Sequence, residues 1–449
     1  MIRMRLSELA ACLGCPAPSR DVTVDAIVSD SRRVDYGSLF AALPGSQVDG
    51  HSFAAAAVKM GAVALLVSRR LELEVPQLVV PDVLRAMGRL AGLLRQRLDP
   101  TVVGITGSNG KTTVKEMVAS ILRPVGEVLA TRGNYNNELG LPLSLFALQP
   151  KHRFAVLELG ASKAGDIAYL AAIAQPDIGL VTNIGPAHLG GFGSVEGVAR
   201  AKGEIYAALP EDGCAIINAD EPWRESWLEV NRAGRVMTFG SQPGCDVRVA
   251  GDERQPRIET PAGGFDLHLA LPGVHNRLNA AAATAAALAL DIDLETIRRG
   301  LEAVEPVPGR LNFIETDAGW TLIDDTYNAN PASLYSALQV LSGMQGTPWL
   351  VLGDMKELGS DSAKMHREVG EAARAMGVKR LFAIGDMSKS TVDAFGEGAE
   401  HFGSHEELAQ SLRRLLHTGI NCLIKGSRSM GMEWVVEAIT RDTSMKEAI

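Results

Sequence analysis

The sequence "GSNGKTT", from Gly107 to Thr113, stands between an apolar run and an amphipathic segment, and it constrains the fold more than any other stretch. The residues just before it, Val102–Thr106, are mostly β-branched and predict a buried strand. After it, apolar side chains recur at i, i+3, i+4, i+7 and i+8 from Val114, which predicts one face of a helix. A strand, a glycine-rich turn and a helix in this order are typical of a parallel α/β sheet.

The same turn has the composition of a phosphate-binding loop. Gly107 and Gly110 allow close backbone approach, Lys111 supplies a cation, and the hydroxyl of Thr112 can ligate Mg²⁺. The usual spacing is G-x-x-x-x-G-K-[ST], and Ile105 stands where its first glycine is expected. The alternative is a glycine-rich turn with an exposed lysine. The strand before the turn and the helix after it favour a nucleotide site, because helix N-termini attract anions.

Size and charge restrict the class of protein. The 449 residues exceed one ordinary core and predict two or three domains. Hydrophobic residues make up 46% and charged residues 22%, as is typical of a globular protein. The net charge of −9 argues against a nucleic-acid-binding protein, which normally carries a basic excess.

The cysteines and apolar runs indicate a compartment. The five cysteines are scattered, which favours a reducing environment without disulfides. Cys12 and Cys15 form a C-x-x-C, but no second pair follows at zinc spacing, so ordinary thiols are the favoured interpretation. The apolar stretch near the start contains Glu8 and is too short for a signal peptide, and the run 280–290 is too short to span a bilayer. We expect a cytoplasmic protein with no membrane span.

Strand-like and helix-like segments alternate almost throughout, which predicts α/β units built on parallel sheets. We expect three domains, at residues 1–82, 83–312 and 313–449. Helices are predicted at Val83–Arg97 and Ser362–Met376. Pro306, Pro308 and Gly309 predict a hinge before the third domain.

Three predicted strands of the middle section end in polar residues: Val102–Thr106, Phe154–Leu159 and Ile178–Asn183. Open parallel sheets bind ligands at the carboxyl ends of their strands, so we expect the chemistry there. Glu158 ends the second strand, where an ionised side chain is costly unless paired or metal-bound, and His188 follows the third on a glycine-rich loop. Taken alone, each of these two residues is more often structural; their common edge favours a function.

These motifs resemble the Mur ligase family, to which folylpolyglutamate synthetase is related. The family's compact loop, G-[ST]-x-G-K-[ST]-[ST], matches Gly107–Thr113, so the missing first glycine is a family trait. The resemblance covers the whole chain in three parts, and it is carried further by Ser29–Gly45, Thr131–Leu145, Ile323–Ser333 and Leu352–Gly359. These stretches are most similar to the members that use D-alanyl-D-alanine. The D-N-P-R signature of the diaminopimelate-adding members is absent, and the uridine-type segment Ser29–Gly45 argues against the folate enzyme.

The resemblance implies a fold and a reaction. The fold would be a small UDP-binding α/β domain, a central ATPase domain with a P-loop-type parallel sheet, and a Rossmann-like C-terminal domain on the D-alanyl-D-alanine side. The enzyme would be a monomeric ATP-dependent ligase that joins D-alanyl-D-alanine to UDP-MurNAc-tripeptide through an acyl phosphate, with two Mg²⁺ ions. Whether the third residue of the tripeptide is diaminopimelate or lysine stays open. A P-loop GTPase or kinase is disfavoured, since neither an N-K-x-D nor an H-R-D motif is found.

The resemblance also implies roles for individual residues. Those implied in catalysis are Lys111, His188, Lys202, Arg310 and Asp325. Those implied at the nucleotide are Gly107, Ser108, Asn109, Gly110, Lys111, Thr112, Thr113, Asn276, Asn279, Arg310 and Asp325. Mg²⁺ would be held by Thr112, Glu158, His188 and a carbamylated Lys202. The UDP-sugar would contact Ser29, Ser31 and Asn137, and the dipeptide would contact Lys425, Ser427 and Arg428. A UDP-sugar-binding protein without activity would not need Lys111, Thr112 and Glu158 together.

Overall fold

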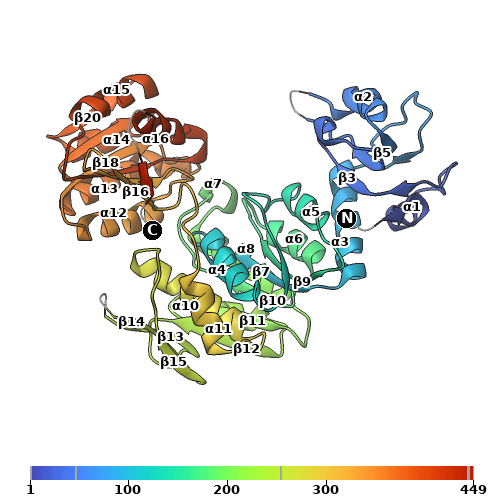
Figure 1. Ribbon diagram of the computed structural model, residues 1–449, viewed down its shortest axis with the longest axis horizontal. Coiled ribbons are helices and arrows are strands. Elements are labelled where there is room, and N and C mark those ends of the chain that lie inside the picture. Colours follow the sequence, from blue (N-terminus) through green and yellow to red (C-terminus); the bar gives the residue numbers. More distant parts are fainter. Residues whose placement is uncertain (1–2, 46–47, 253–254, 442–444, 448–449) are drawn as a thin grey trace.

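The structure, a computed structural model, describes residues 3–45, 48–252, 255–441 and 445–447. The chain forms three α/β units in sequence order, and the predicted class of parallel α/β sheets is confirmed. The N-terminal unit, in blue, and the C-terminal unit, in orange and red, lie on opposite sides of the central unit (Figure 1). Among the described residues, no helix is long and apolar enough to cross a membrane.

The N-terminal unit is built on a four-stranded parallel sheet in the order β3-β4-β5-β6. A short antiparallel pair, β1-β2, lies beside the helix α1. The bounds of these elements are β1 Met4–Arg5, α1 Leu6–Leu13, β2 Thr23–Val24, β3 Ala26–Val28, η1 Ser31–Arg33, β4 Ser38–Ala41, η2 Gly50–Phe53, α2 Ala54–Lys59, β5 Ala62–Val67 and β6 Gln77–Val79.

The central unit is built on a nine-stranded sheet in the order β15-β14-β13-β12-β11-β10-β7-β9-β8. The strands from β8 to β13 are parallel, and β14 and β15 are antiparallel. The strands are β7 Thr101–Thr106, β8 Glu127–Ala130, β9 His152–Glu158, β10 Ile178–Val181, β11 Cys214–Asn218, β12 Arg235–Gly240, β13 Val247–Gly251, β14 Pro256–Thr260 and β15 Gly263–Asp266. Because β7 lies between β9 and β10, the three strands predicted to end together do so.

Helices cover both faces of the central sheet. They are α3 Val83–Leu98, α4 Lys111–Leu122, α5 Gly140–Leu145, α6 Asp166–Ala174, α7 Leu189–Phe192, α8 Val195–Ala207, α9 Arg224–Val230, α10 Val274–Leu288 and α11 Leu294–Glu302. On one face α4 packs against α10 and α11, and the alanines of α10 allow a close approach to α4 and the sheet. On the other face α3 contacts α1, α5 and α6, so its apolar side joins the N-terminal and central units. The helix predicted at Val83–Arg97 is confirmed within one residue.

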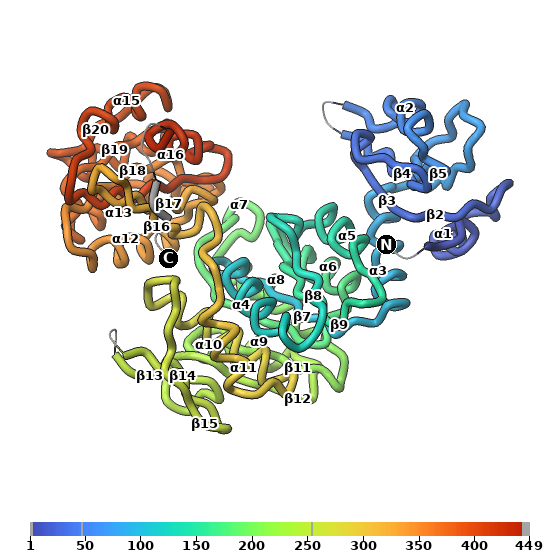
Figure 2. Tube along the Cα trace, viewed as in Figure 1, coloured from blue at the N-terminus to red at the C-terminus, as the bar shows by residue number. Residues whose placement is uncertain are grey.

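The C-terminal unit has a seven-stranded sheet in the order β20-β19-β18-β21-β17-β16-β22, of which β16 is antiparallel to both neighbours. Its elements are β16 Asn312–Thr316, β17 Thr321–Asp325, α12 Pro331–Gly343, β18 Thr347–Gly353, η3 Gly359–Asp361, α13 Ser362–Ala375, β19 Arg380–Ile384, α14 Lys389–Phe395, β20 Ala399–Phe402, α15 His405–Leu415, β21 Ile420–Lys425, η4 Arg428–Met430, α16 Glu433–Thr440 and β22 Met445–Glu447. The predicted helix Ser362–Met376 is therefore confirmed as α13. Figure 2 follows the chain from α11 into β16 through a single connecting segment, which contains the predicted hinge.

Candidate active site

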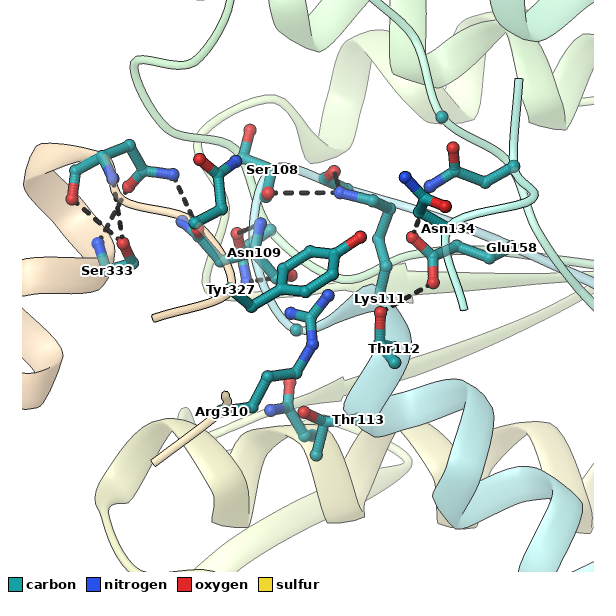
Figure 3. A pocket seen from close by; sticks show the side chains of 18 of the residues that line it. Ser108, Asn109, Lys111, Thr112, Thr113, Asn134, Glu158, Arg310, Tyr327 and Ser333 are labelled. Carbon is teal, nitrogen blue, oxygen red and sulfur yellow. Dashed lines mark hydrogen bonds between the residues drawn. The ribbon is translucent and has the colours of Figure 1, made fainter. Parts of the chain in front are cut away.

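A cavity of about 730 Å³ lies at the junction of the central and C-terminal units (Figure 3). The predicted residues that line it are Gly107–Thr113, Asn137, Glu158, His188, Lys202, Asn276, Asn279, Arg310, Asp325, Lys425 and Arg428. Within the described part of the chain, Ser29, Ser31 and Ser427 do not line the cavity. The cavity therefore collects residues from both units around the predicted phosphate loop.

The loop's two predicted glycines meet steric demands that other residues cannot meet. Gly107 has φ +147°, and a Cβ there would lie 1.8 Å from Oγ1 of Thr182. Gly110 has φ +80°, and a Cβ there would lie 2.5 Å from Oδ1 of Asn279. The loop thus lies directly against the segment after β10 and against α10, and only glycine allows this approach.

Two of the loop's N–H groups are used by a residue that sequence reasoning missed. Ser108 N–H donates to the carbonyl of Asn183 at 2.9 Å, and Asn109 N–H donates to Oδ1 of Asn183 at 3.0 Å. The helix α4 begins at Lys111, and the first N–H groups of a helix have no intrahelical acceptor. The backbone N–H groups left for a phosphate are therefore those at the start of α4, because those of Ser108 and Asn109 already have acceptors. The only sequence signal for Asn183 was its position at the end of a strand.

The ammonium of Lys111 lies over the loop. Its Nζ donates to the carbonyls of Gly107, at 2.8 Å, and Ser108, at 3.3 Å. Burial lowers the pKa of Lys111, and the nearby charge of Glu158 opposes that shift. A bound phosphate would offer this cation a negative partner in place of two neutral carbonyls.

The buried carboxylate of Glu158 fits a Mg²⁺ site. It is 2% exposed, and its Oε2 accepts from the hydroxyl of Thr112 at 2.8 Å. Its Oε1 accepts from Nδ2 of Asn136 at 2.7 Å, so Asn136, which the sequence reasoning did not single out, orients the carboxylate. No group of three or more His, Cys, Asp or Glu side chains that could hold a metal occurs within the described ranges. A hydroxyl, one carboxylate and phosphate oxygens form the oxygen-rich set that Mg²⁺ prefers.

Lys202 lies deep in the same cavity, on α8. It is 2% exposed, and burial lowers its pKa well below the ordinary value, with the charge of Lys111 acting in the same direction. Its Nζ is 6.0 Å from the ring centroid of Phe192. Because burial favours a neutral amine, this side chain can react with CO₂, and a carbamate there would add oxygens beside Glu158. The residues present therefore fit the carbamate that the family resemblance implies.

His188 lies on the cavity wall and contacts the C-terminal unit. Its Nδ1 contacts Oε2 of Glu357, from the loop before η3. Burial lowers the pKa of His188, while the charge of Glu357 opposes the shift. His188 and Glu357 both have positive φ, at 53° and 64°. A lowered pKa favours the neutral imidazole that a metal ligand requires.

The C-terminal unit positions Arg310 through the carboxyl end of β17. Gly309 N–H donates to Oδ2 of Asp324 at 3.1 Å, and Leu311 N–H donates to Oδ1 of Asp325 at 3.2 Å. The guanidinium of Arg310 lies 4.0 Å from the ring centroid of Tyr327, as Figure 3 shows. Sequence reasoning did not single out Tyr327. Arg310 therefore belongs structurally to the C-terminal sheet.

Asp325 and Lys425 form a buried ion pair at adjacent strand ends. Lys425 Nζ donates to Oδ2 of Asp325 at 2.5 Å and to the carbonyl of Asn328 at 2.9 Å. Burial raises the pKa of Asp325, and the charges of Lys425 and Arg310 oppose the shift. The structure thus joins two residues for which the sequence predicted separate partners, the nucleotide and the dipeptide.

The other two residues predicted for the dipeptide differ in their freedom. Ser427 is 4% exposed. Its hydroxyl accepts from Lys356 N–H at 2.8 Å and donates to the carbonyl of Ala329 at 3.3 Å. Arg428 lines the cavity with a side chain that is 60% exposed, and it contacts Glu433 at 3.2 Å. Arg428 is the more accessible of the two to a ligand.

The residues predicted for the UDP-sugar lie in two places. Ser29 follows β3, and Ser31 begins η1, where Asp30 caps the turn by accepting from Arg32 N–H at 3.0 Å. Asn137 lies at the cavity, and its Oδ1 accepts from Gly140 N–H at 2.8 Å at the start of α5.

A phosphate-type loop, a buried carboxylate and basic side chains from a second α/β unit line one cavity, as is expected of a nucleotide-binding enzyme whose site lies between domains. The chain belongs to the Mur ligase family. Residues 23–95 match the model described as "Mur ligase family, catalytic domain", residues 105–287 match "Mur ligase middle domain", and residues 309–428 match "Mur ligase, glutamate ligase domain". The resemblance expected from the sequence is confirmed.

Three similar proteins cover nearly the whole chain. The UDP-N-acetylmuramoyl-tripeptide–D-alanyl-D-alanine ligase of Escherichia coli K12 is 43% identical over 447 residues, covering 98% of this chain and 99% of the relative. A crystal structure of MurF from Acinetobacter baumannii is 35% identical with a TM-score of 0.91, covering 98% of this chain and 100% of that one. MurF from Thermotoga maritima in complex with ADP is 30% identical with a TM-score of 0.84, covering 93% and 97%.

Proposed function

We propose that this chain joins D-alanyl-D-alanine to UDP-MurNAc-tripeptide with ATP, giving the UDP-MurNAc-pentapeptide, ADP and phosphate. One observation carries the proposal. The start of α4, the carboxylate of Glu158, and Arg310 with Asp325 from the other unit line one cavity. The Escherichia coli relative, which covers 98% of this chain, carries the name of this activity. We propose that the enzyme is a cytoplasmic monomer. The domain bounds expected from the sequence are 1–82, 83–312 and 313–449, and because β16 begins at Asn312 and Gly309 and Leu311 are bonded to the end of β17, we propose that the last boundary lies a few residues earlier.

The reaction would proceed in two steps. The terminal carboxylate of the tripeptide attacks the γ-phosphorus of ATP, so a new P–O bond forms and ADP leaves. The amine of the dipeptide then attacks the acyl carbon, the tetrahedral intermediate loses phosphate, and the amine proton passes to solvent or a base. The main work of the protein is to position the reactants and to neutralise charge, because carboxylate and triphosphate repel each other.

The central unit would supply the binding groups for the phosphates and metals. Lys111 would contact the β- and γ-phosphates, and the start of α4 would donate N–H groups to them. Thr112 and Glu158 would hold one Mg²⁺, and His188 with a carbamylated Lys202 would hold a second. These ions, when bound, would neutralise charge between the two anionic substrates.

Two further contacts would place the base and the γ-phosphate. Asn279 Nδ2 donates to Oδ1 of Asn276 at 3.1 Å, and Asn276 Nδ2 donates to the carbonyl of Pro272 at 2.8 Å, so both amides are oriented on the wall of the cavity where the adenine would lie. Arg310 and Asp325 already line the cavity beside the loop and would face the ATP, and the hinge at Pro306, Pro308 and Gly309 would let the C-terminal unit open and close over it.

The N-terminal unit would bind the uridine end of the sugar substrate. Ser29 and Ser31 lie at the carboxyl end of β3, where a parallel sheet offers a ligand site. Asn137 would contact the substrate where it enters the central cavity. The UDP-sugar and its peptide would therefore span the N-terminal and central units.

For the dipeptide, we propose that Arg428 binds the carboxylate. The buried Lys425 and Ser427 would act indirectly, by holding the segment that carries Arg428 in place. Arg428→Ala should raise KM for D-alanyl-D-alanine by about 10- to 100-fold, because one charge-assisted hydrogen bond is lost. KM for ATP should stay within about twofold. Steady-state kinetics measure both constants.

Glu433→Gln is the matched control, because it removes the negative charge paired with Arg428 and leaves the arginine in place. Its KM for the dipeptide should not rise. Equal increases in the two KM values of Arg428→Ala would count against a dipeptide role and indicate a general disturbance of the cavity.

The proposed reaction is tested by phosphate release from ATP with UDP-MurNAc-tripeptide. Release should depend on D-alanyl-D-alanine and should not respond to L-alanyl-L-alanine. Running the assay with diaminopimelate and with lysine as the third residue would identify the tripeptide. Release that ignores the dipeptide, or that accepts the L,L form equally, would overturn the proposal.

A further inference from the structure

The N-terminus of α12 touches the phosphate loop, and this contact joins two units that fold around separate sheets. Nδ2 of Asn330 donates to Oδ1 of Asn109 at 2.8 Å, although the two residues are 221 positions apart. Asn109 belongs to the predicted phosphate loop, and Asn330 is the N-cap of α12. Figure 3 shows Asn109 and the start of α12 at Ser333 side by side.

The two ends of the Asn330 amide have different partners. Its Oδ1 accepts from the backbone N–H of Ser333 at 2.9 Å, and the backbone N–H of Asn330 donates to Oγ of Ser333 at 3.1 Å, which completes a capping box. With Oδ1 committed to the helix, Nδ2 is the end that faces the central unit. Because Nδ2 is a donor, the side chain of Asn109 has to offer an acceptor, and it does so with Oδ1.

Asn109 is held independently by the segment after β10. Its N–H donates to Oδ1 of Asn183 at 3.0 Å, and its carbonyl accepts from Oγ1 of Thr182 at 2.6 Å and from Nδ2 of Asn183 at 3.1 Å. All these partners belong to the central unit. A group that binds the side chain of Asn109 is therefore placed relative to the phosphate loop.

Around this hydrogen bond, Gly185 leaves just enough room for a side-chain carbon in ordinary van der Waals contact with both units. A Cβ on Gly185 would lie 3.6 Å from Cβ of Ala332 and 3.8 Å from Cβ of Ser108, so Gly185 separates α12 from the loop. Ser108 Oγ accepts from Gly185 N–H at 2.9 Å and is 3.2 Å from the Gly185 carbonyl. Loop, Gly185 segment and α12 thus form one contiguous contact around the Asn109–Asn330 hydrogen bond.

We propose that Asn330 is a positioning residue that aligns the C-terminal unit with the phosphate loop. The proposal rests on the proposed function, because the alignment matters for ATP in the loop. α12 follows β17 directly in the chain, and the end of β17 holds Asp325 and, through Gly309 and Leu311, Arg310. An error in docking α12 therefore displaces the groups that must face the phosphates.

Asn330→Ser tests this role, because serine is also a good N-cap but is too short to reach Asn109. We expect kcat to fall about 3- to 10-fold, as for one lost hydrogen bond, while KM for ATP changes less than about twofold. The matched control is Ser333→Ala, which removes half of the capping box and leaves the Asn109 contact. Its kcat should stay within about twofold of wild type. A wild-type kcat in Asn330→Ser, or an equal loss in Ser333→Ala, would overturn the proposal.

A double-mutant cycle separates positioning from general weakening of the fold. Asn109→Ala should lower kcat as well, but combining it with Asn330→Ser should add little, since both changes remove the same bond. Two effects that multiply would show that the residues act separately and would overturn the coupling.

Hydrogen exchange with ADP and Mg²⁺ distinguishes this proposal from the proposed function, since it needs neither the tripeptide nor the dipeptide. In the wild-type chain, ADP should slow exchange of the amides at 331–336. In Asn330→Ser that slowing should disappear, while exchange without ADP stays the same. If phosphate release ignores D-alanyl-D-alanine but this pattern holds, the proposed function fails and the coupling stands. If ligation is shown and ADP protects α12 equally in both proteins, the coupling fails.

Discussion

Lys111→Met is expected to lower kcat of ATP-dependent ligation by about 10³-fold. Lys111 Nζ lies over the phosphate loop, where it donates to the carbonyls of Gly107 and Ser108 at 2.8 and 3.3 Å. Methionine has a similar length and no charge, so it leaves the developing charge on the γ-phosphate without its cation. Phosphate release and binding of ADP measure the effect.

The same variant should not be less stable than the wild-type chain. Burial lowers the pKa of Lys111, so the unfolded chain holds that proton more tightly than the folded one. The ammonium therefore destabilises the fold at neutral pH, and stability rises with pH through the window between the lowered folded value and the ordinary one. Replacing the ammonium with an apolar side chain removes this penalty. A Tm without nucleotide equal to or above that of the wild type is expected; a large fall would show that the lost activity reflects unfolding.

Lys163→Met is the matched control for charge. Lys163 also lines the cavity, but it is exposed and lies before α6 rather than over the loop. Its loss should cost much less than the about 10³-fold expected at Lys111. Equal losses would mean that the total positive charge of the cavity matters and the position of Lys111 does not.

Lys202→Ala is expected to lower kcat by about 10³-fold, and short carboxylic acids such as acetate should restore part of it. Burial lowers the pKa of Lys202 well below the ordinary value, so the side chain is available as a free amine. The amine nitrogen can then bond to the carbon of CO₂ and release one proton, giving a carbamate. Alanine leaves space for an added carboxylate to supply the missing oxygens.

Mass spectrometry gives a second measurement, since the carbamate adds the mass of one CO₂ to the peptide that contains Lys202 after chemical trapping. Activity of the wild-type enzyme should also fall in buffers stripped of CO₂ and recover on adding bicarbonate. Lys202→Arg should not be rescued, because its guanidinium fills the space and stays charged. Full activity of Lys202→Ala without additives would remove the carbamate from the mechanism.

Sequence patterns predicted the parts of the site that depend on neighbouring residues. The strand, loop and helix around Gly107–Thr113 follow from local periodicity, and the glycines follow from local torsion angles. The meeting of β7, β9 and β10 was also predictable, because parallel strands end at a common edge. These features need no knowledge of which distant segments pack together.

The missed residues share a different property. Asn136, Asn183, Tyr327 and Asn330 each contact a residue that is distant in the sequence. An asparagine at the end of a strand or at a helix cap is already explained by the turn or cap that it forms with neighbouring residues. Periodicity and spacing therefore carry no signal for its second partner.

By itself, the sequence determined that this chain forms parallel α/β units, where the phosphate loop lies, and which side chains end on its edge of the sheet. These features follow from the side-chain period, glycine torsions and helix N-termini, which act over a few residues. Only the tertiary structure decided which of those side chains are free. It pairs Lys425 with Asp325, gives the hydroxyl of Ser427 two backbone partners, leaves Arg428 accessible and docks Asn330 on Asn109. The reason is physical: a buried polar group must find a partner, and that partner is chosen by packing between segments far apart in the chain.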